Sequence, residues 1–137
     1  MEKEIRVLLV DDERPVLRSM EKTFLRAGFD VGTAGNVSQG LALFKQELGG
    51  DAPFDIAVLD LNMPNFDGVE SADAGFNLLQ KLLEIQPDLP VIVLTAFDTV
   101  SKAKVAIHAG ARDYFVKGRE EGLVELVRKT LEKNDAN

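Results

Sequence analysis

Strand-like and helix-like segments alternate strictly along this chain of 137 residues. Short apolar runs bounded by turn residues predict strands at 5–10, 30–34, 55–60, 90–95 and 113–116. Apolar side chains recur at helical spacing in the stretches between and after them, at 14–27, 36–48, 76–86, 99–109 and 120–132. Such alternation is typical of an α/β domain in which helices cover both faces of a parallel sheet.

The runs at 55–60 and 90–95 are apolar without alternation, as expected for central strands that are buried on both faces. Right-handed crossovers would wind the chain into a three-layer α/β/α sandwich. We expect the flavodoxin-like strand order 2-1-3-4-5, which places the first and third predicted strands side by side. The length fits one domain, 1–137, with a core from about residue 5 to residue 131 and a short polar C-terminal tail.

Composition excludes several classes of function. The net charge of −7 argues against binding of nucleic acid by this segment. The absence of cysteine rules out disulfides, thiolate metal sites and cysteine nucleophiles. No apolar run reaches the roughly 18 residues that cross a bilayer, and the charged start of the chain does not resemble a signal peptide. We therefore expect a cytoplasmic protein without a membrane partner.

Polar side chains follow four of the predicted strands, at the point where each strand ends. They are Asp11 and Asp12, Asp60, Thr95, and Lys117. The C-terminal ends of parallel strands meet at one edge of an open α/β sheet, where such folds bind ligands. A helix cap explains a single aspartate there but not the whole set. Three close carboxylates need a compensating cation, and an oxygen-rich site with open positions suits Mg²⁺.

A carboxylate in such a site can act as a nucleophile toward phosphorus and form an aspartyl phosphate. Phosphoryl transfer depends mainly on positioning and on neutralisation of charge. Mg²⁺ and Lys117 could supply the positive charge, and Thr95 could donate its hydroxyl to a phosphoryl oxygen.

Five motifs extend this interpretation. In chain order they are Val-Asp-Asp-Glu (10–13), Leu-Asp-Leu-Asn-Met-Pro (59–64), Leu-Thr-Ala (94–96), Gly-Ala-Arg-Asp-Tyr (110–114) and Phe-Val-Lys (115–117). Each motif is weak alone, but all five in order at strand ends are specific. The chain resembles the receiver domain of two-component response regulators over essentially all residues from 5 to 131.

The resemblance implies a role for each matching position. Asp60 matches the phosphoacceptor, which takes the phosphoryl group from the phosphohistidine of a histidine kinase or phosphotransfer protein. Asp12 matches the direct ligand of Mg²⁺, and Asp11 the ligand that usually acts through water. Asn62 matches the position whose backbone carbonyl binds Mg²⁺. Lys117 matches the lysine that contacts the phosphoryl group.

The resemblance also implies a conformational switch made by Thr95 and Tyr114. A phosphate adds negative charge and acceptor oxygens. Thr95 would move toward it, and Tyr114 would rotate inward to fill the space. This change would alter the surface formed by 99–109, 113–116 and 120–132. An effector domain or a downstream protein could read that surface, and two copies of the chain could associate through it.

On this interpretation the chain is not an enzyme but a domain that catalyses only its own phosphorylation and dephosphorylation. The main alternative is a receiver-like interaction module that does not cycle phosphate. An aspartyl-phosphate hydrolase is disfavoured because its two aspartates are separated by one residue after the first strand, whereas Asp11 and Asp12 are adjacent. A flavodoxin is disfavoured because no loop rich in Ser, Thr and Gly follows Val10.

Two positions depart from the family pattern. Most receivers have proline after the conserved lysine, joined by a cis bond, whereas Gly118 follows Lys117 here. A cis bond without proline costs about 2.5–4 kcal/mol, so we expect a trans bond. The helical pattern after Asp60 also starts late, which predicts an enlarged loop over about 61–75 with an insertion of about seven residues. Gly75 could then be the glycine that leads into the helix.

Overall fold

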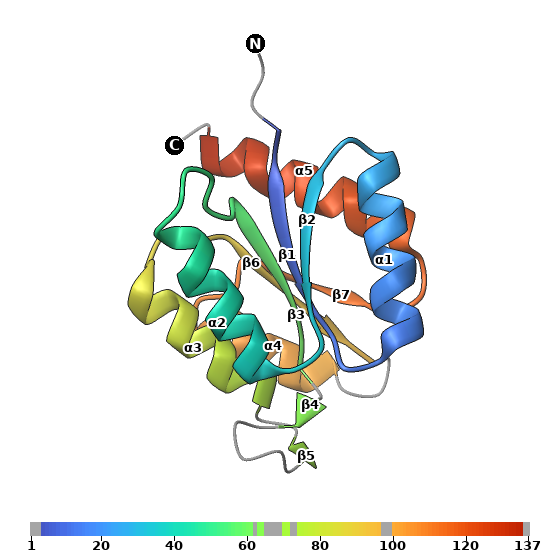
Figure 1. Cartoon of the computed structure of the whole chain (residues 1–137). Helices are drawn as coiled ribbons and strands as arrows, with labels where there is room; N and C mark the ends of the chain where they lie inside the picture. The colour runs from blue at the N-terminus through green and yellow to red at the C-terminus, as the bar shows by residue number, and fades with distance from the viewer. Residues whose placement is uncertain (1–3, 62, 65–69, 72–73, 97–99, 136–137) are drawn as a thin grey trace.

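Five parallel strands form the central sheet of the computed structural model, in the order β2-β1-β3-β6-β7 (Figure 1). The strands are β1 (Arg6–Val10), β2 (Asp30–Ala34), β3 (Ile56–Asp60), β6 (Val91–Thr95) and β7 (Asp113–Val116). The helices are α1 (Arg14–Arg26), α2 (Val37–Leu48), α3 (Ala74–Ile85), α4 (Val100–His108) and α5 (Glu120–Asp135). The structure describes residues 4–61, 63–64, 70–71, 74–96 and 100–135. The predicted fold class and strand order are confirmed, and α5 extends further into the polar tail than predicted.

Helices cover both faces of the sheet, with α1 and α5 on one face and α2, α3 and α4 on the other. Strand β1 shows why both faces must be covered. Leu9 packs in one core with Phe24 of α1, while Leu8 packs in the other core with Leu78 of α3. Successive residues of a strand point to opposite faces, so an unbroken apolar run needs a helical layer on each side.

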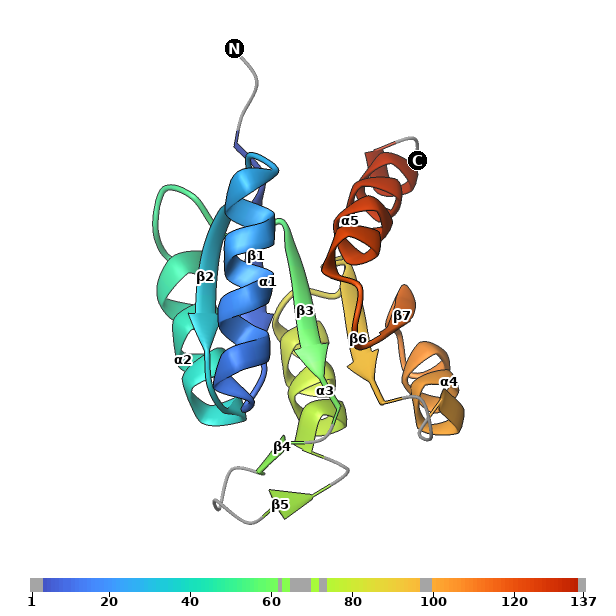
Figure 2. The ribbon, with the colours of Figure 1, turned by 90° about the vertical axis from the view of Figure 1, so that its right-hand side faces the viewer.

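The sequence pattern predicted that the connection between β3 and α3 is a loop, but this connection also contains secondary structure. It contains two short strands, β4 (Met63–Pro64) and β5 (Glu70–Ser71), which pair antiparallel beyond the C-terminal end of β3 (Figure 2). Pairings of two residues are too short to show an alternating pattern in the sequence. Helix α3 then begins at Ala74, slightly before the first residue of its apolar pattern.

Arg6 joins several elements at the other end of the sheet, where β1 begins. Its guanidinium donates to Asp30 at 2.5 Å, to Glu47 at 3.0 Å and to the carbonyl of Ala52. It also lies 4.7 Å from the centroid of the Phe54 ring. These contacts connect the start of β1 with β2, with α2 and with the segment before β3.

Replacement of Arg6 with methionine should therefore lower the free energy of unfolding by about 1–3 kcal/mol, because Asp30 and Glu47 lose their shared cation. Urea unfolding of the purified variant measures this. Arg18→Met is the matched control, since Arg18 is exposed on α1 and forms no ion pair within the described part of the chain. Equal losses in the two variants would contradict the assignment of Arg6 as a structural connection.

Candidate functional site

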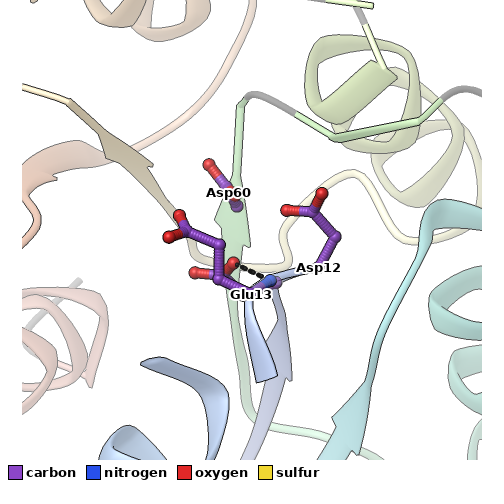
Figure 3. A group of neighbouring side chains, drawn as sticks. Asp12, Glu13 and Asp60 are labelled. Atoms are coloured by element: carbon purple, nitrogen blue, oxygen red, sulfur yellow. Dashed lines mark hydrogen bonds between the residues drawn. The ribbon is translucent and has the colours of Figure 1, made fainter. Parts of the chain in front are cut away.

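Four carboxylates meet where β1 and β3 end. Asp11 follows β1 directly and Asp60 is the last residue of β3, and the two strands are paired neighbours. Both side chains are buried, whereas Asp12 is half-buried and Glu13 is exposed. Each of the four offers an oxygen within 4.8 Å of the others. Figure 3 shows Asp12, Glu13 and Asp60 gathered at these strand ends.

Lys117 brings a positive charge into this cluster from the loop after β7. Its ammonium Nζ lies 2.6 Å from Oε1 of Glu13, 3.0 Å from Oδ2 of Asp60 and 3.1 Å from Oδ2 of Asp11. The contact with Asp11 is an ion pair without hydrogen-bond geometry. Oδ2 of Asp11 is consequently a buried oxygen with no hydrogen-bond donor among the described residues.

The carboxylates of the cluster repel one another and attract the ammonium, and burial together with these interactions shifts the pKa values of Asp12 and Lys117. Burial raises the pKa of Asp12, and the adjacent charge of Asp11 raises it further. Burial alone would lower the pKa of Lys117, but hydrogen bonds to Glu13 and Asp60 outweigh that effect and raise it above its ordinary range. Lys117 therefore stays charged at neutral pH, and the stability it contributes is lost only as the pH rises through its raised pKa.

Thr95 and Tyr114 lie on the adjacent strands β6 and β7, and Thr95 is the last residue of β6. Asp60 pairs with Leu94 of β6, so Thr95 extends one residue beyond it. Thr95 is fully buried, and its hydroxyl donates to the carbonyl of Ala96 at 3.1 Å. Tyr114 pairs with Val93, two residues before Thr95, and this register puts both side chains on one face of the sheet. Tyr114 is half-buried against the core beneath α2, α3 and α4.

The backbone around the site explains how Lys117 reaches the carboxylates. No cis peptide bond occurs within the described ranges, so the predicted trans bond between Lys117 and Gly118 is confirmed. Gly118 has a φ of +143°, a conformation that side chains with a Cβ rarely adopt. Gly118 thus allows the chain to turn directly after Lys117. Asn62, predicted to bind a cation through its carbonyl, lies outside the described residues.

Two residues of the site received no firm role from the sequence. Glu13 contacts Lys117 directly, and its only signal in the sequence is its position after two aspartates. Gly75, the second residue of α3, donates its N–H to the carbonyl of Leu61 at 3.3 Å. A Cβ on Gly75 would lie 2.1 Å from the carbonyl oxygen of Asp60, so α3 packs directly on the backbone that carries this carboxylate.

These features define a doubly wound α/β domain with a lysine and a carboxylate cluster at the C-terminal edge of its sheet. The sequence profile of the response regulator receiver domain matches residues 7–128. The chain belongs to this family, and it is a receiver domain of the kind found in two-component systems.

Curated relatives and solved structures agree with this assignment. The chain is 35% identical to the response regulator MprA of Mycobacterium avium and 32% identical to the C4-dicarboxylate transport transcriptional regulatory protein DctD of Rhizobium meliloti. The matches cover 96% and 93% of this chain but only 55% and 25% of those relatives. The chain thus spans about half or less of their length.

Two solved receiver domains share the fold over nearly their whole length. A CheY-like receiver domain protein from Methanospirillum hungatei superposes with a TM-score of 0.80 at 26% identity, covering 98% of each chain. A receiver domain protein from Clostridium thermocellum gives a TM-score of 0.83 at 23% identity, covering 96% of this chain and 98% of its own. None of the helices in the described part of the chain is long and apolar enough to cross a membrane.

Proposed function

We propose that this receiver domain is a switch that accepts a phosphoryl group on Asp60 from the phosphohistidine of a histidine kinase or phosphotransfer protein. The observation that carries the proposal is the geometry at Asp60. Its carboxylate is almost fully buried at the end of a central strand, and the Lys117 ammonium lies 3.0 Å from Oδ2. The positive charge that would neutralise the phosphoryl oxygens during transfer therefore already lies beside the nucleophile, as phosphoryl transfer requires.

In the forward reaction an oxygen of Asp60 attacks phosphorus and forms the new O–P bond. The P–N bond of the donor breaks, and its electron pair returns to the histidine. Lys117 would neutralise the charge on the phosphoryl oxygens, and the Thr95 hydroxyl would turn from the carbonyl of Ala96 to donate to one of them. The chain would act only on its own phosphorylation and dephosphorylation, so we do not class it as an enzyme.

The donor set at this edge fits Mg²⁺. Receiver domains generally use Mg²⁺ at an acidic pocket, and here four carboxylates lie within reach of one another while Oδ2 of Asp11 lacks a hydrogen-bond donor. Asp12, Asp60 and, through water, Asp11 would hold the ion, together with the backbone carbonyl of Asn62. The ion would supply positive charge for the phosphoryl oxygens and offset the repulsion among the carboxylates.

Thr95 and Tyr114 would transmit the change. Tyr114 and Thr95 share one face of β6 and β7, which supports the proposal that Tyr114 fills the space that Thr95 would leave when it turns to the phosphoryl group. Inward rotation of Tyr114 would change the surface of α4, β7 and α5. We propose that an effector domain or downstream protein reads this surface, and that two copies of the chain can associate through it.

We propose one receiver domain over residues 1–137, with a core at about 5–131 and an enlarged β3–α3 connection at about 61–75. Its relatives are longer regulators, one of them named a transcriptional regulatory protein, and we propose an attached effector domain as a partner. The segment itself would not bind nucleic acid, given its net charge of −7. We propose a cytoplasmic location.

Incubation with Mg²⁺ and acetyl phosphate, followed by intact mass spectrometry, tests the proposed function. We expect the mass of one phosphoryl group to appear on the wild-type chain, and to be absent when a chelator removes Mg²⁺. A folded chain that stays unmodified with both small donors and a phosphohistidine donor would favour the alternative, an interaction module without phosphate cycling.

Asp12→Asn should have opposite effects on stability without and with Mg²⁺. Without the ion, the raised pKa of Asp12 means that its charged form destabilises the folded state. This cost is present above the raised pKa and fades as the pH falls toward the ordinary value of about 3.9. The variant should therefore be more stable than the wild type at pH 7, and this advantage should disappear in acid.

With millimolar Mg²⁺ the order should reverse, because the ion stabilises only the folded state that binds it. Urea unfolding with and without Mg²⁺ at pH 7 measures both effects. Asp88→Asn, in an exposed turn far from the cluster, should respond to Mg²⁺ as the wild type does. An equal gain from Mg²⁺ in the Asp12 variant would exclude Asp12 as a ligand.

A further inference from the structure

The shortest contact of the Lys117 ammonium is with the carboxylate of Glu13. The distance from Nζ to Oε1 of Glu13 is 2.6 Å, against 3.0 Å to Asp60 and 3.1 Å to Asp11. The three partners differ in burial. The side chain of Glu13 is 58% exposed, whereas those of Asp11 and Asp60 are essentially inaccessible. Glu13 is thus the solvent-exposed partner of the ammonium, whereas the proposed phosphoacceptor carboxylate is a buried one.

The Glu13 side chain does not cap helix α1. Glu13 occupies the N-cap position of α1, where a side chain commonly accepts a hydrogen bond from an N–H of the first turn. Pro15 in that turn has no N–H to donate, and the Glu13 side chain makes no cap hydrogen bond. The backbone N–H of Glu13 donates to Oδ1 of Asp11 at 2.9 Å. The Glu13 side chain is directed to Lys117 rather than to the helix.

We propose that Glu13 is a positioning residue that competes with the phosphoryl group for Lys117 and thereby shortens the life of phosphorylated Asp60. This inference rests on the proposed function. An ammonium has three N–H donors, and Lys117 already faces three carboxylates. When Asp60 carries a phosphoryl group, the Lys117 ammonium must exchange at least one of its carboxylate contacts for a contact with the phosphoryl oxygens. Glu13 opposes this change, because it holds the ammonium by the shortest of the three contacts.

Hydrolysis ends the phosphorylated state in a balanced step. The oxygen of a water molecule attacks phosphorus, the acyl O–P bond breaks, and its electron pair returns to the Asp60 carboxylate. The water proton leaves with the released phosphate. The restored Asp60 carboxylate regains Lys117 as its partner, and Glu13 stabilises that product arrangement. Loss of the Glu13 charge should therefore favour the phosphorylated state, in which Lys117 pairs with the phosphoryl group alone.

Three variants separate the contact from its charge. Glu13→Gln keeps the length of the side chain but removes the charge. Glu13→Asp keeps the charge but is one methylene shorter, so it should not reach Lys117. Glu121→Gln removes a charge from an exposed position on α5 that forms no ion pair within the described residues. Each is phosphorylated with acetyl phosphate and Mg²⁺, the donor is removed, and intact mass spectrometry follows the decay.

Both Glu13 variants should lengthen the half-life of the phosphorylated chain by about two- to fivefold, the range expected for a partly exposed ion pair. Glu121→Gln should decay as the wild type does. Urea unfolding should show that the variants are folded. A merely structural role of Glu13 would change the free energy of unfolding but not the half-life of the phosphorylated chain. An unchanged half-life in Glu13→Gln would overturn the inference. A longer half-life in Glu13→Gln with a wild-type half-life in Glu13→Asp would overturn it too, since charge alone would then act.

The two proposals fail in different ways. If the wild-type chain gains no phosphoryl group, the proposed function fails and the role of Glu13 fails with it. If the wild-type chain is phosphorylated and the Glu13 variants decay at its rate, only the role of Glu13 is refuted.

Discussion

Asp60→Asn should abolish acceptance of the phosphoryl group. The amide has nearly the same shape as the carboxylate, but it lacks the charge and the nucleophilic oxygen that must attack phosphorus. The neighbouring carboxylates cannot substitute, because Asp11 is buried against Lys117 and Asp12 is proposed to bind the metal. With acetyl phosphate and Mg²⁺, the intact mass of the variant should stay unchanged while the wild type gains one phosphoryl group.

The control for this experiment is Asp88→Asn, which makes the same chemical change at an exposed turn. It should be phosphorylated at the wild-type rate. The Asp60 variant should also remain folded, because removal of one charge from a crowded acidic cluster relieves repulsion. Phosphorylation of folded Asp60→Asn at the wild-type rate would place the phosphoacceptor elsewhere, and peptide mapping of the product would locate it.

Gly75→Ala should be the most destabilising small substitution near the site. Alanine normally stabilises a helix relative to glycine by roughly 0.5–1 kcal/mol. Here its Cβ would lie 2.1 Å from the carbonyl oxygen of Asp60 and 2.6 Å from Cα of Leu61. Both are backbone atoms, which cannot rotate away, so α3 would have to move off the end of β3. We expect a loss of about 3 kcal/mol or more in the free energy of unfolding.

Urea unfolding of Gly75→Ala beside Gly49→Ala tests this prediction. Gly49 has a φ of −80°, and the nearest atom to an added Cβ is 3.8 Å away. Alanine should therefore be neutral there or stabilising by up to about 1 kcal/mol. Any Gly75→Ala chain that folds should also be phosphorylated more slowly, because the shift displaces Asp60. An unfolding free energy at or above the wild-type value would show that α3 can yield without cost.

Much of this molecule could be predicted from its sequence because two signals were strong. The unbroken apolar runs at β3 and β6 required burial on both faces, and that requirement led to the layered fold. Asp11, Asp60 and Lys117 could be brought together because each follows a strand, and parallel strands end at one edge. These inferences depend only on local pattern and on the direction of the strands.

The sequence was less informative where tertiary contacts decide. The β4–β5 pairing is too short to leave a periodic pattern, and the importance of Gly75 arises from the backbone of Asp60, which is distant in sequence. Glu13 was one more acidic residue until the structure placed its carboxylate against Lys117. By itself the sequence determined the fold, the edge of the site and the family. The tertiary structure decided which carboxylates share Lys117, because ion pairing depends on distances that the order of residues does not contain.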